Sequence, residues 1–282
     1  MDVELELLAT GYGLGEGPRT DDSGALWYTD IRGGTVHRRD PDGTIETVLE
    51  GRESVGGLAV HADGGLVMSG PTVVHWNDGE LRPLLELDGV VAFNDLHTDS
   101  QGRVYVGAIR CELEDLRNEP DPKGECYRIE LDGSITELYG DVGVSNGIGF
   151  SPDGSILYHV DSTSRGVWAH DIDAAGQVSN RRHLGHEVFQ RGIPDGMCID
   201  EQGNLWVAHV GPGRVAVLNA SGELIDEVDV PAKWVTSCAF GGADRQDLYI
   251  VSADNTDDES LRGCVWRCRP GATGLATPLA RV

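Results

Sequence analysis

A short pattern that recurs six times constrains this chain more than any other feature of its sequence. Each copy has an apolar run, a polar turn that usually ends in glycine, and a second run rich in aromatic and β-branched residues. Such runs, bounded by turn residues, are typical of antiparallel β-strands joined by tight connections. The second runs lie at residues 25–28, 65–68, 103–106, 156–159, 204–207 and 247–250.

The spacing of the pattern predicts the architecture. A third run often follows the second, so each unit is expected to be a four-stranded antiparallel meander of about 40 residues. Six such sheets arranged radially make a six-bladed β-propeller, an all-β fold that leaves only short, protected edges. Residues 3–8 alternate like a strand and could close the ring by pairing with the last blade. A β-sandwich is the structural alternative. We therefore predict that residues 1–282 form a single propeller domain.

The turn glycines set a register between the repeats. Gly24, Gly64, Gly102, Gly154 and Gly203 each end the turn after the first run. The residues eight positions earlier lie just before the innermost strand of each predicted blade, and in a propeller all such positions meet at one mouth of the central channel. Those residues are Glu16, Gly56, Asn94, Asn146 and Asp195, with Ser237 as the nearest counterpart in the sixth repeat.

Four of these positions carry oxygen donors, and we call Glu16, Asn94, Asn146 and Asp195 the four register residues. Two carboxylates and two amide oxygens that converge make a site suited to Ca²⁺, Mg²⁺ or Mn²⁺. Such a site would lie in the central channel and leave open positions for water and substrate. The alternative interpretation is that Asn-Gly and Asp-Gly pairs at these positions are ordinary turn sequences.

Several motifs resemble the senescence-marker-protein, gluconolactonase and luciferin-regenerating-enzyme family, to which regucalcin belongs. They are GEGP at 15–18, FND at 93–95, SNGI at 145–148, PDGMCID at 194–200 and TSC at 236–238. The resemblance implies a six-bladed propeller with one divalent metal ion in its channel, bound directly by Glu16, Asn146 and Asp195. It also implies that Asp195 is the general base, and that Asn94 binds the metal through water or contacts the substrate.

The resemblance implies a metal-dependent lactonase, an enzyme that opens the ester ring of a lactone. We expect one divalent ion, with Ca²⁺ favoured by the oxygen ligands and Zn²⁺, Mn²⁺ or Mg²⁺ as alternatives. A phosphotriesterase-like hydrolase on the same site is one alternative function, and a non-catalytic calcium-binding propeller is another.

Three further positions bear on the substrate. Ala92 stands where the sugar-lactone branch of the family has an arginine, so the substrate is expected to be less polar than a sugar lactone. Glu112 matches the family's substrate-contacting carboxylate and opens a loop, from Cys111 to Cys126, that could form a lid. His209 follows Asp195 by 14 residues and could line the pocket as a substrate-binding residue, or could be a structural histidine.

Composition restricts the partners. Lys+Arg total 22 against 47 Asp+Glu, which gives a formal net charge of −25. A field of this sign disfavours nucleic acid and anionic membranes, so we expect a small-molecule substrate and a monomer or small homo-oligomer.

The acidic N-terminus is unlike a signal peptide, which predicts a cytoplasmic protein. Its 6 cysteines are then expected to be thiols, although Cys111 and Cys126 could pair. The acidic surface also suits a high-salt habitat.

Overall fold

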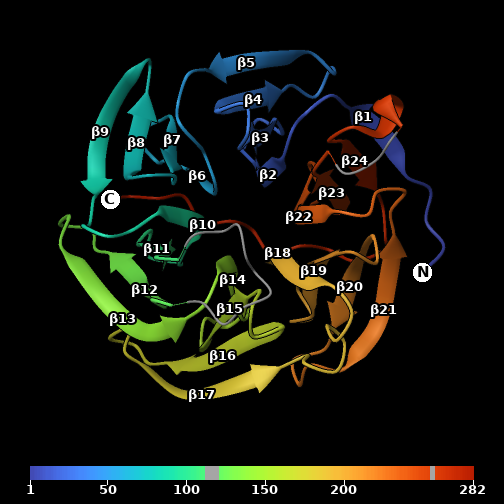
Figure 1. The fold of residues 1–282 in the computed structure, drawn as a ribbon. Coiled ribbons are helices and arrows are strands. Elements are labelled where there is room, and N and C mark those ends of the chain that lie inside the picture. The colour runs from blue at the N-terminus through green and yellow to red at the C-terminus, as the bar shows by residue number, and fades with distance from the viewer. Residues whose placement is uncertain (112–120, 255–257) are drawn as a thin grey trace.

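The strands pair into six four-stranded antiparallel sheets, counted over residues 1–111, 121–254 and 258–282, which the computed structural model describes. The sheets stand around a common centre like the blades of a propeller (Figure 1). Each of the six predicted second runs forms the second strand of a blade, counted from the centre. The predicted six-bladed β-propeller is therefore confirmed.

Blades 1 to 3 each run outward from the centre in chain order. Their strands are, for blade 1, β2 (Gly15–Thr20), β3 (Leu26–Asp30), β4 (Thr35–Arg39) and β5 (Ile45–Leu49); for blade 2, β6 (Leu58–Val60), β7 (Leu66–Met68), β8 (Val73–Asn77) and β9 (Glu80–Leu85); and for blade 3, β10 (Ala92–Thr98), β11 (Val104–Ile109), β12 (Gly124–Ile129) and β13 (Ile135–Val142).

Blades 4 and 5 repeat this order, and blade 6 is completed by the first strand of the chain. The predicted closure is confirmed, because Glu6 of β1 pairs with Arg267 of β24. The strands are, for blade 4, β14 (Ser145–Phe150), β15 (Ile156–Asp161), β16 (Gly166–Ile172) and β17 (Val178–Leu184); for blade 5, β18 (Ile193–Ile199), β19 (Leu205–Val210), β20 (Arg214–Leu218) and β21 (Leu224–Asp229); and for blade 6, β22 (Val235–Gly241), β23 (Asp247–Ser252), β24 (Val265–Cys268) and β1 (Glu6–Ala9).

The turns between the first and second strands explain the regular glycines. All five register glycines have positive φ, from 70° at Gly154 to 93° at Gly102, a conformation that side chains with a Cβ rarely adopt. An aspartate opens several of these turns and accepts backbone N–H groups from the turn itself. Asp200, for example, accepts from the backbone of Gln202 and Asn204, and from the indole of Trp206 at 3.0 Å. The turns therefore fix where each inner strand ends.

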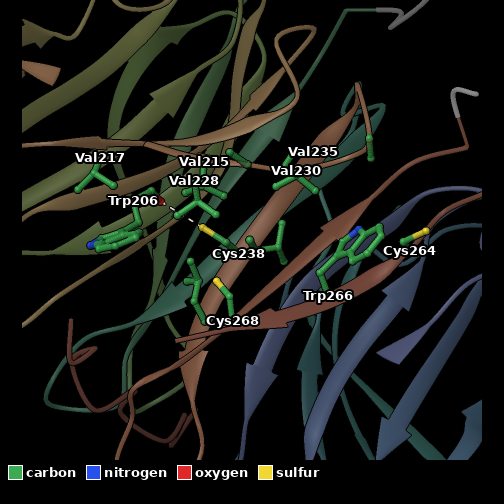
Figure 2. Packing of buried hydrophobic residues seen from close by; sticks show 14 of the residues in the cluster. Trp206, Val215, Val217, Val228, Val230, Val235, Cys238, Cys264, Trp266 and Cys268 are labelled. Carbon is green, nitrogen blue, oxygen red and sulfur yellow. Dashed lines mark hydrogen bonds between the residues drawn. The ribbon is translucent and has the colours of Figure 1, made fainter. Parts of the chain in front are cut away.

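The hydrophobic core lies between neighbouring blades. Figure 2 shows the contact of blades 5 and 6, where Trp206 and three valines of blade 5 face Cys238 and Trp266 of blade 6. The ring of Trp206 meets Phe240 edge-on, with centroids 5.2 Å apart. Large apolar side chains fill the wedge between twisted sheets, and this packing holds the inner strands at a fixed spacing.

Residues 269–282, which we call the C-terminal strap, cross the face of the ring that lies opposite the starts of the inner strands (Figure 1). The strap pairs with blade 5 through Asp200 and Gly274, and with blade 2 through His61 and Ala280. It therefore ties blade 6 to both of these blades.

Two further findings concern the expectations from composition. None of the 6 cysteines, all of which lie in the described residues, forms a disulfide, so Cys111 and Cys126 are not paired with each other. Among the described residues, the single helix is the short 3₁₀ turn η2 (Glu259–Leu261), and no helix there is long and apolar enough to span a membrane.

Candidate active site

The four register residues lie at the beginnings of four inner strands. Glu16 is in β2, Asn94 in β10, Asn146 in β14 and Asp195 in β18. The amide of Asn94 donates from Nδ2 to Oδ1 of Asn146 at 2.9 Å, which joins blades 3 and 4. The carboxylate of Asp195 is near enough to Glu16 to raise the pKa of Glu16. Residues drawn from four blades are thus brought together at one end of the inner strands.

A β-bulge interrupts the pairing of each of these inner strands. The register with the second strand shifts between Glu16 and Arg19 in blade 1, and between Pro194 and Met197 in blade 5. Blades 3 and 4 have the same irregularity, next to Asn94 and Asn146. A bulge bends the strand and re-aims its side chains, and bulges are frequent beside active sites. Each of the four register residues therefore lies beside a bulge, and all four bulges are at the same end of the inner strands.

The glycines that follow the register residues are not turn residues. Gly147 and Gly196 both lie within strands, so the alternative interpretation of Asn-Gly and Asp-Gly as turn sequences is wrong at these two positions. A Cβ on Gly196 would come within 2.1 Å of Ser237 Oγ, and one on Gly147 within 2.6 Å of the Met197 nitrogen. These positions require glycine because the inner strand of the next blade passes too closely for a side chain.

Three acidic groups make the site strongly electronegative. Burial is the main cause that raises the pKa of Glu16 and of Asp195 well above the ordinary values, and neighbouring carboxylates add to the effect. Asp95 is the third acid, and burial also raises its pKa, although Arg19 opposes the shift from 3.3 Å. Acids this close together repel each other when ionised, so this cluster is stabilised either by a bound proton or by a bound cation.

Asn146 is held on both sides. Its Oδ1 accepts from Asn94, and its Nδ2 donates to Ser162 Oγ at 2.9 Å. The Ser162 hydroxyl in turn donates to the carbonyl oxygen of Pro194, the residue before Asp195, at 2.8 Å. Sequence reasoning missed Ser162, whose only signal is its place just after β15, at the strand end that returns to this face.

His209 also lies at such a strand end, at the end of β19. It is fully buried, Arg214 Nε donates to its Nδ1 at 3.2 Å, and its ring meets Phe189 edge-on. Burial, helped by Arg214, lowers the pKa of His209 to about 4. Within the described part of the chain its polar and ring contacts do not include the four register residues. Glu112 and most of the expected lid lie outside the described residues.

The donor set fits a divalent cation. Among the described residues, no three His, Cys, Asp or Glu side chains gather into a metal-binding group, so a metal here would need amide oxygens as well. Glu16 and Asp195 supply two carboxylates, and Asn94 and Asn146 supply two amide oxygens, which is the chemistry that Ca²⁺ and Mg²⁺ prefer. Burial and neighbouring carboxylates raise the pKa of both acids, and a bound cation would offset both effects.

Fold and site together define a class: six-bladed β-propellers with an oxygen-donor cluster where the inner strands begin. Residues 14–254 match the family model described as "SMP-30/Gluconolactonase/LRE-like region". The chain belongs to this family, which confirms the resemblance seen in its motifs.

Individual relatives agree with this assignment. A 6-deoxy-6-sulfogluconolactonase of Pseudomonas putida is 34% identical over 270 residues, covering 90% of each chain. A regucalcin of Xenopus laevis is 34% identical over 282 residues, covering 96% of this chain and 92% of the relative. The solved structure of a luciferin-regenerating enzyme superposes with a TM-score of 0.88 at 27% identity, and covers 100% of both chains.

Proposed function

We propose that this protein is a metal-dependent lactonase whose active site is built from the four register residues. The observation that carries the proposal is the convergence of Glu16, Asn94, Asn146 and Asp195 on bulged inner strands of four blades. Family membership supports the reaction class, because lactonases occur among the relatives. The substrate is then a small lactone.

In this mechanism Glu16, Asn146 and Asp195 would hold one divalent ion, with Ca²⁺ favoured and Zn²⁺, Mn²⁺ or Mg²⁺ as alternatives. The chemistry that such an ion supplies when bound is polarisation of the lactone carbonyl and stabilisation of developing negative charge. Asp195 takes a proton from the attacking water through a carboxylate oxygen, as a general base. The oxygen of that water bonds to the carbonyl carbon, the ring ester bond breaks, and Asp195 returns the proton to the departing alkoxide oxygen.

The environment of Asp195 suits a proton carrier. Its side chain is half-buried, so a substrate can reach it, while burial and Asp95 raise its pKa and so make it a stronger base. The hydrogen bonds from Ser162 to the Pro194 carbonyl and from Asn146 to Ser162 fix the strand that carries Asp195. This network orients the base relative to the metal ligands.

Asn94, Glu112 and His209 remain predicted substrate-binding residues. Ala92 opens β10 and is half-buried, so the chain offers no guanidinium there to grip sugar hydroxyls. We infer that the preferred lactone is less polar than a sugar lactone. Efficient turnover of gluconolactone would contradict this inference.

Hydrolysis of a lactone panel and of a phosphotriester panel, each with and without EDTA, tests the proposal. We expect lactone turnover that EDTA abolishes and a divalent ion restores. Asp195→Asn keeps the shape of the side chain and removes its basicity, so it should reduce kcat by at least about a hundredfold, a typical size for general-base catalysis. Asp132→Asn, in an exposed turn, is the matched control and should keep wild-type turnover.

Each other outcome identifies a different function. Faster turnover of phosphotriesters than of lactones would indicate the phosphotriesterase-like alternative. Calcium binding without turnover of either panel would indicate the non-catalytic propeller. Wild-type activity in Asp195→Asn would show that the site has been assigned to the wrong residues.

A further inference from the structure

A cavity with a volume of about 550 Å³ lies at the end of the inner strands opposite to the four register residues. Arg19, His97, Phe150, Met197 and Phe240 are among its lining residues, and none of the four register residues is. Arg19 and His97 each follow a register residue by three positions on the same strand. At roughly 3.3 Å per residue, this cavity is about 10 Å further along the ring axis. We call it the lower pocket.

The lower pocket is covered by the C-terminal strap. Leu275, Ala276, Thr277 and Pro278 line it. Hydrogen bonds to the backbone of the strap hold it in place, because Leu275 N donates to Ile199 O at 3.1 Å and the Thr98 side chain donates from Oγ1 to Pro278 O at 2.6 Å. The pocket is therefore enclosed by the fold itself, and residues far away in the sequence cover it.

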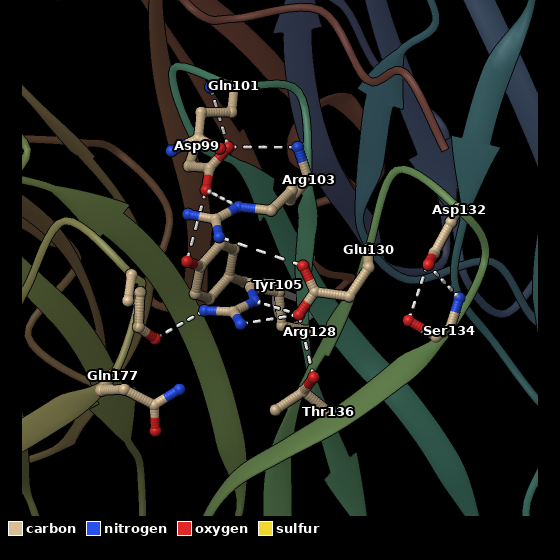
Figure 3. A network of polar contacts seen from close by, with 12 residues as sticks. Asp99, Gln101, Arg103, Tyr105, Arg128, Glu130, Asp132, Ser134, Thr136 and Gln177 are labelled. Carbon is tan, nitrogen blue, oxygen red and sulfur yellow. Dashed lines mark hydrogen bonds and ion pairs between the residues drawn. The ribbon is translucent and has the colours of Figure 1, made fainter.

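Most charged groups of the lower pocket are already engaged with the protein. Asp99 accepts from Arg103 Nε at 2.6 Å and from the backbone of its own turn, and the same network continues to Glu130 (Figure 3). Asp153 and Asp173 likewise accept from backbone N–H groups of their own turns. These side chains shape the pocket and offer little to a ligand.

Two of the polar lining residues, Arg19 and His97 on the inner strands, keep unused hydrogen-bonding capacity. Arg19 is 4% exposed, and its two terminal nitrogens bond to Pro18 O, Leu96 O and Asp95, while its Nε–H has no hydrogen-bond acceptor among the described residues. His97 Nδ1 lies 2.8 Å from the carbonyl oxygen of Thr98 and must donate to it. Burial lowers the pKa of His97 to about 4, so at neutral pH its Nε2 is an acceptor, and it has no donor within the described chain.

The rest of the lining determines the class of ligand. The charged lining residues are Arg19, Arg103 and Arg245 against Asp99, Asp153 and Asp173, so the formal charges cancel. Because the formal charges of the lining cancel, the lining does not favour binding of an anion or of a cation. Phe150, Met197 and Phe240 provide an apolar surface beside the open donor and the open acceptor, which is the usual make-up of a small-molecule pocket.

We propose that the lower pocket binds an uncharged ring compound that presents a carbonyl or ether oxygen to Arg19 and a hydroxyl to His97, with its ring on the apolar wall. This site is separate from the candidate active site and does not depend on the proposed function. Arg19 also forms an ion pair with Asp95, the residue after Asn94. A ligand bound to Arg19 would therefore be connected to the four register residues through this ion pair.

Binding of 4-hydroxycyclohexanone, followed by saturation-transfer NMR on the full chain in EDTA, tests the proposal. We expect measurable binding that is weaker for cyclohexanone, which lacks the hydroxyl, and for 4-hydroxycyclohexanecarboxylate, which is charged. His97→Phe keeps a ring against Phe150 but removes the acceptor, and should weaken binding about three- to tenfold, the scale of one hydrogen bond. His186→Phe, the same change at an exposed histidine, should have no effect.

A second variant keeps the proposal testable if His97→Phe does not fold. Ala276 is exposed on the strap and lines the pocket, so Ala276→Trp should obstruct the pocket without disturbing the core. Loss of binding in Ala276→Trp, with binding retained in Asp195→Asn, would support the proposal. Absence of binding to the wild-type protein, or binding that is lost in Asp195→Asn but kept in Ala276→Trp, would overturn it.

Discussion

The acidic residues of the candidate active site differ in how their charge is compensated. Arg19 faces Asp95, whereas Glu16 and the half-buried Asp195 lie near other carboxylates, and removal from water raises the pKa of both. Sequence reasoning found Glu16 and Asp195 through the register. It did not find the role of Asp95, because the register predicts which residues face the centre and not which charges are neutralised by a residue of another blade, here Arg19 of blade 1.

The raised pKa values predict a pH-dependent metal affinity. A proton held by Glu16 or Asp195 must leave before a cation binds, so affinity should rise as pH increases through the raised pKa values and then level off. Calorimetric titration of the EDTA-treated protein with Ca²⁺ at pH 6, 7 and 8 measures this directly. An affinity that is the same at all three pH values would contradict the prediction, because it would mean that neither acid holds a proton that competes with the metal in this range.

Ser162 offers a test of positioning in the active site. Ser162→Ala removes the acceptor of Asn146 Nδ2 and the donor to Pro194 O, so we expect kcat/KM for a lactone to fall roughly three- to thirtyfold, the scale of one or two hydrogen bonds. Ser164→Ala, a nearby serine that bonds to Asp161, is the control. Equal activity in both variants would show that Asn146 holds its orientation without Ser162.

At the scale of the element, sequence and structure agree best where the repeat determines the strands. The second strands, the turn glycines and the pairing of β1 with β24 were all predictable, because periodicity and turn residues are local signals. The bulges of the inner strands were not, since a bulge appears only when two paired strands differ in length. The lower pocket was also not predictable, because the strap that covers it carries no repeat.

The close approach of inner strands gives a prediction about stability. Gly196→Ala places a methyl group on Ser237, so blades 5 and 6 must separate or strain, at a cost of about 1–3 kcal/mol of unfolding free energy. Gly140→Ala is the control, because a Cβ there would have only Glu125 within 4 Å, at 3.9 Å. Denaturant unfolding of both variants measures the difference. Adding Ser237→Gly to Gly196→Ala should recover part of the loss, and equal stability of the two alanine variants would contradict the prediction.

At the scale of the whole molecule, charge is the dominant feature. The formal net charge of −25 is what remains after all 22 Lys and Arg charges have been counted against the 47 acids, so the folded state repels itself at low ionic strength. Salt screens this repulsion over a Debye length of about 10 Å at 0.1 M and about 3 Å at 1 M.

We therefore expect the melting temperature to rise between 0.05 M and 1 M KCl. A gain of about 1–2 kcal/mol corresponds to roughly 2–5 °C for a chain of this size. Differential scanning calorimetry measures the change, and sucrose at matched osmolality separates screening from solvent exclusion. A melting temperature that falls with KCl would mean that attractive ion pairs outweigh the net repulsion.

The closure of blade 6 also has a consequence for the order of folding during synthesis. Glu6 leaves the ribosome 261 residues before Arg267, its partner in the β1–β24 pairing. Blades 1 to 5 can form in sequence as they emerge, because each is continuous in the chain. Until the last blade is made, β1 has no partner and the ring stays open, with the faces of blades 1 and 5 that pack against blade 6 in contact with water. The nascent protein is therefore most vulnerable to aggregation when blades 1 to 5 have formed but blade 6 has not, because apolar surface is then exposed on an open ring.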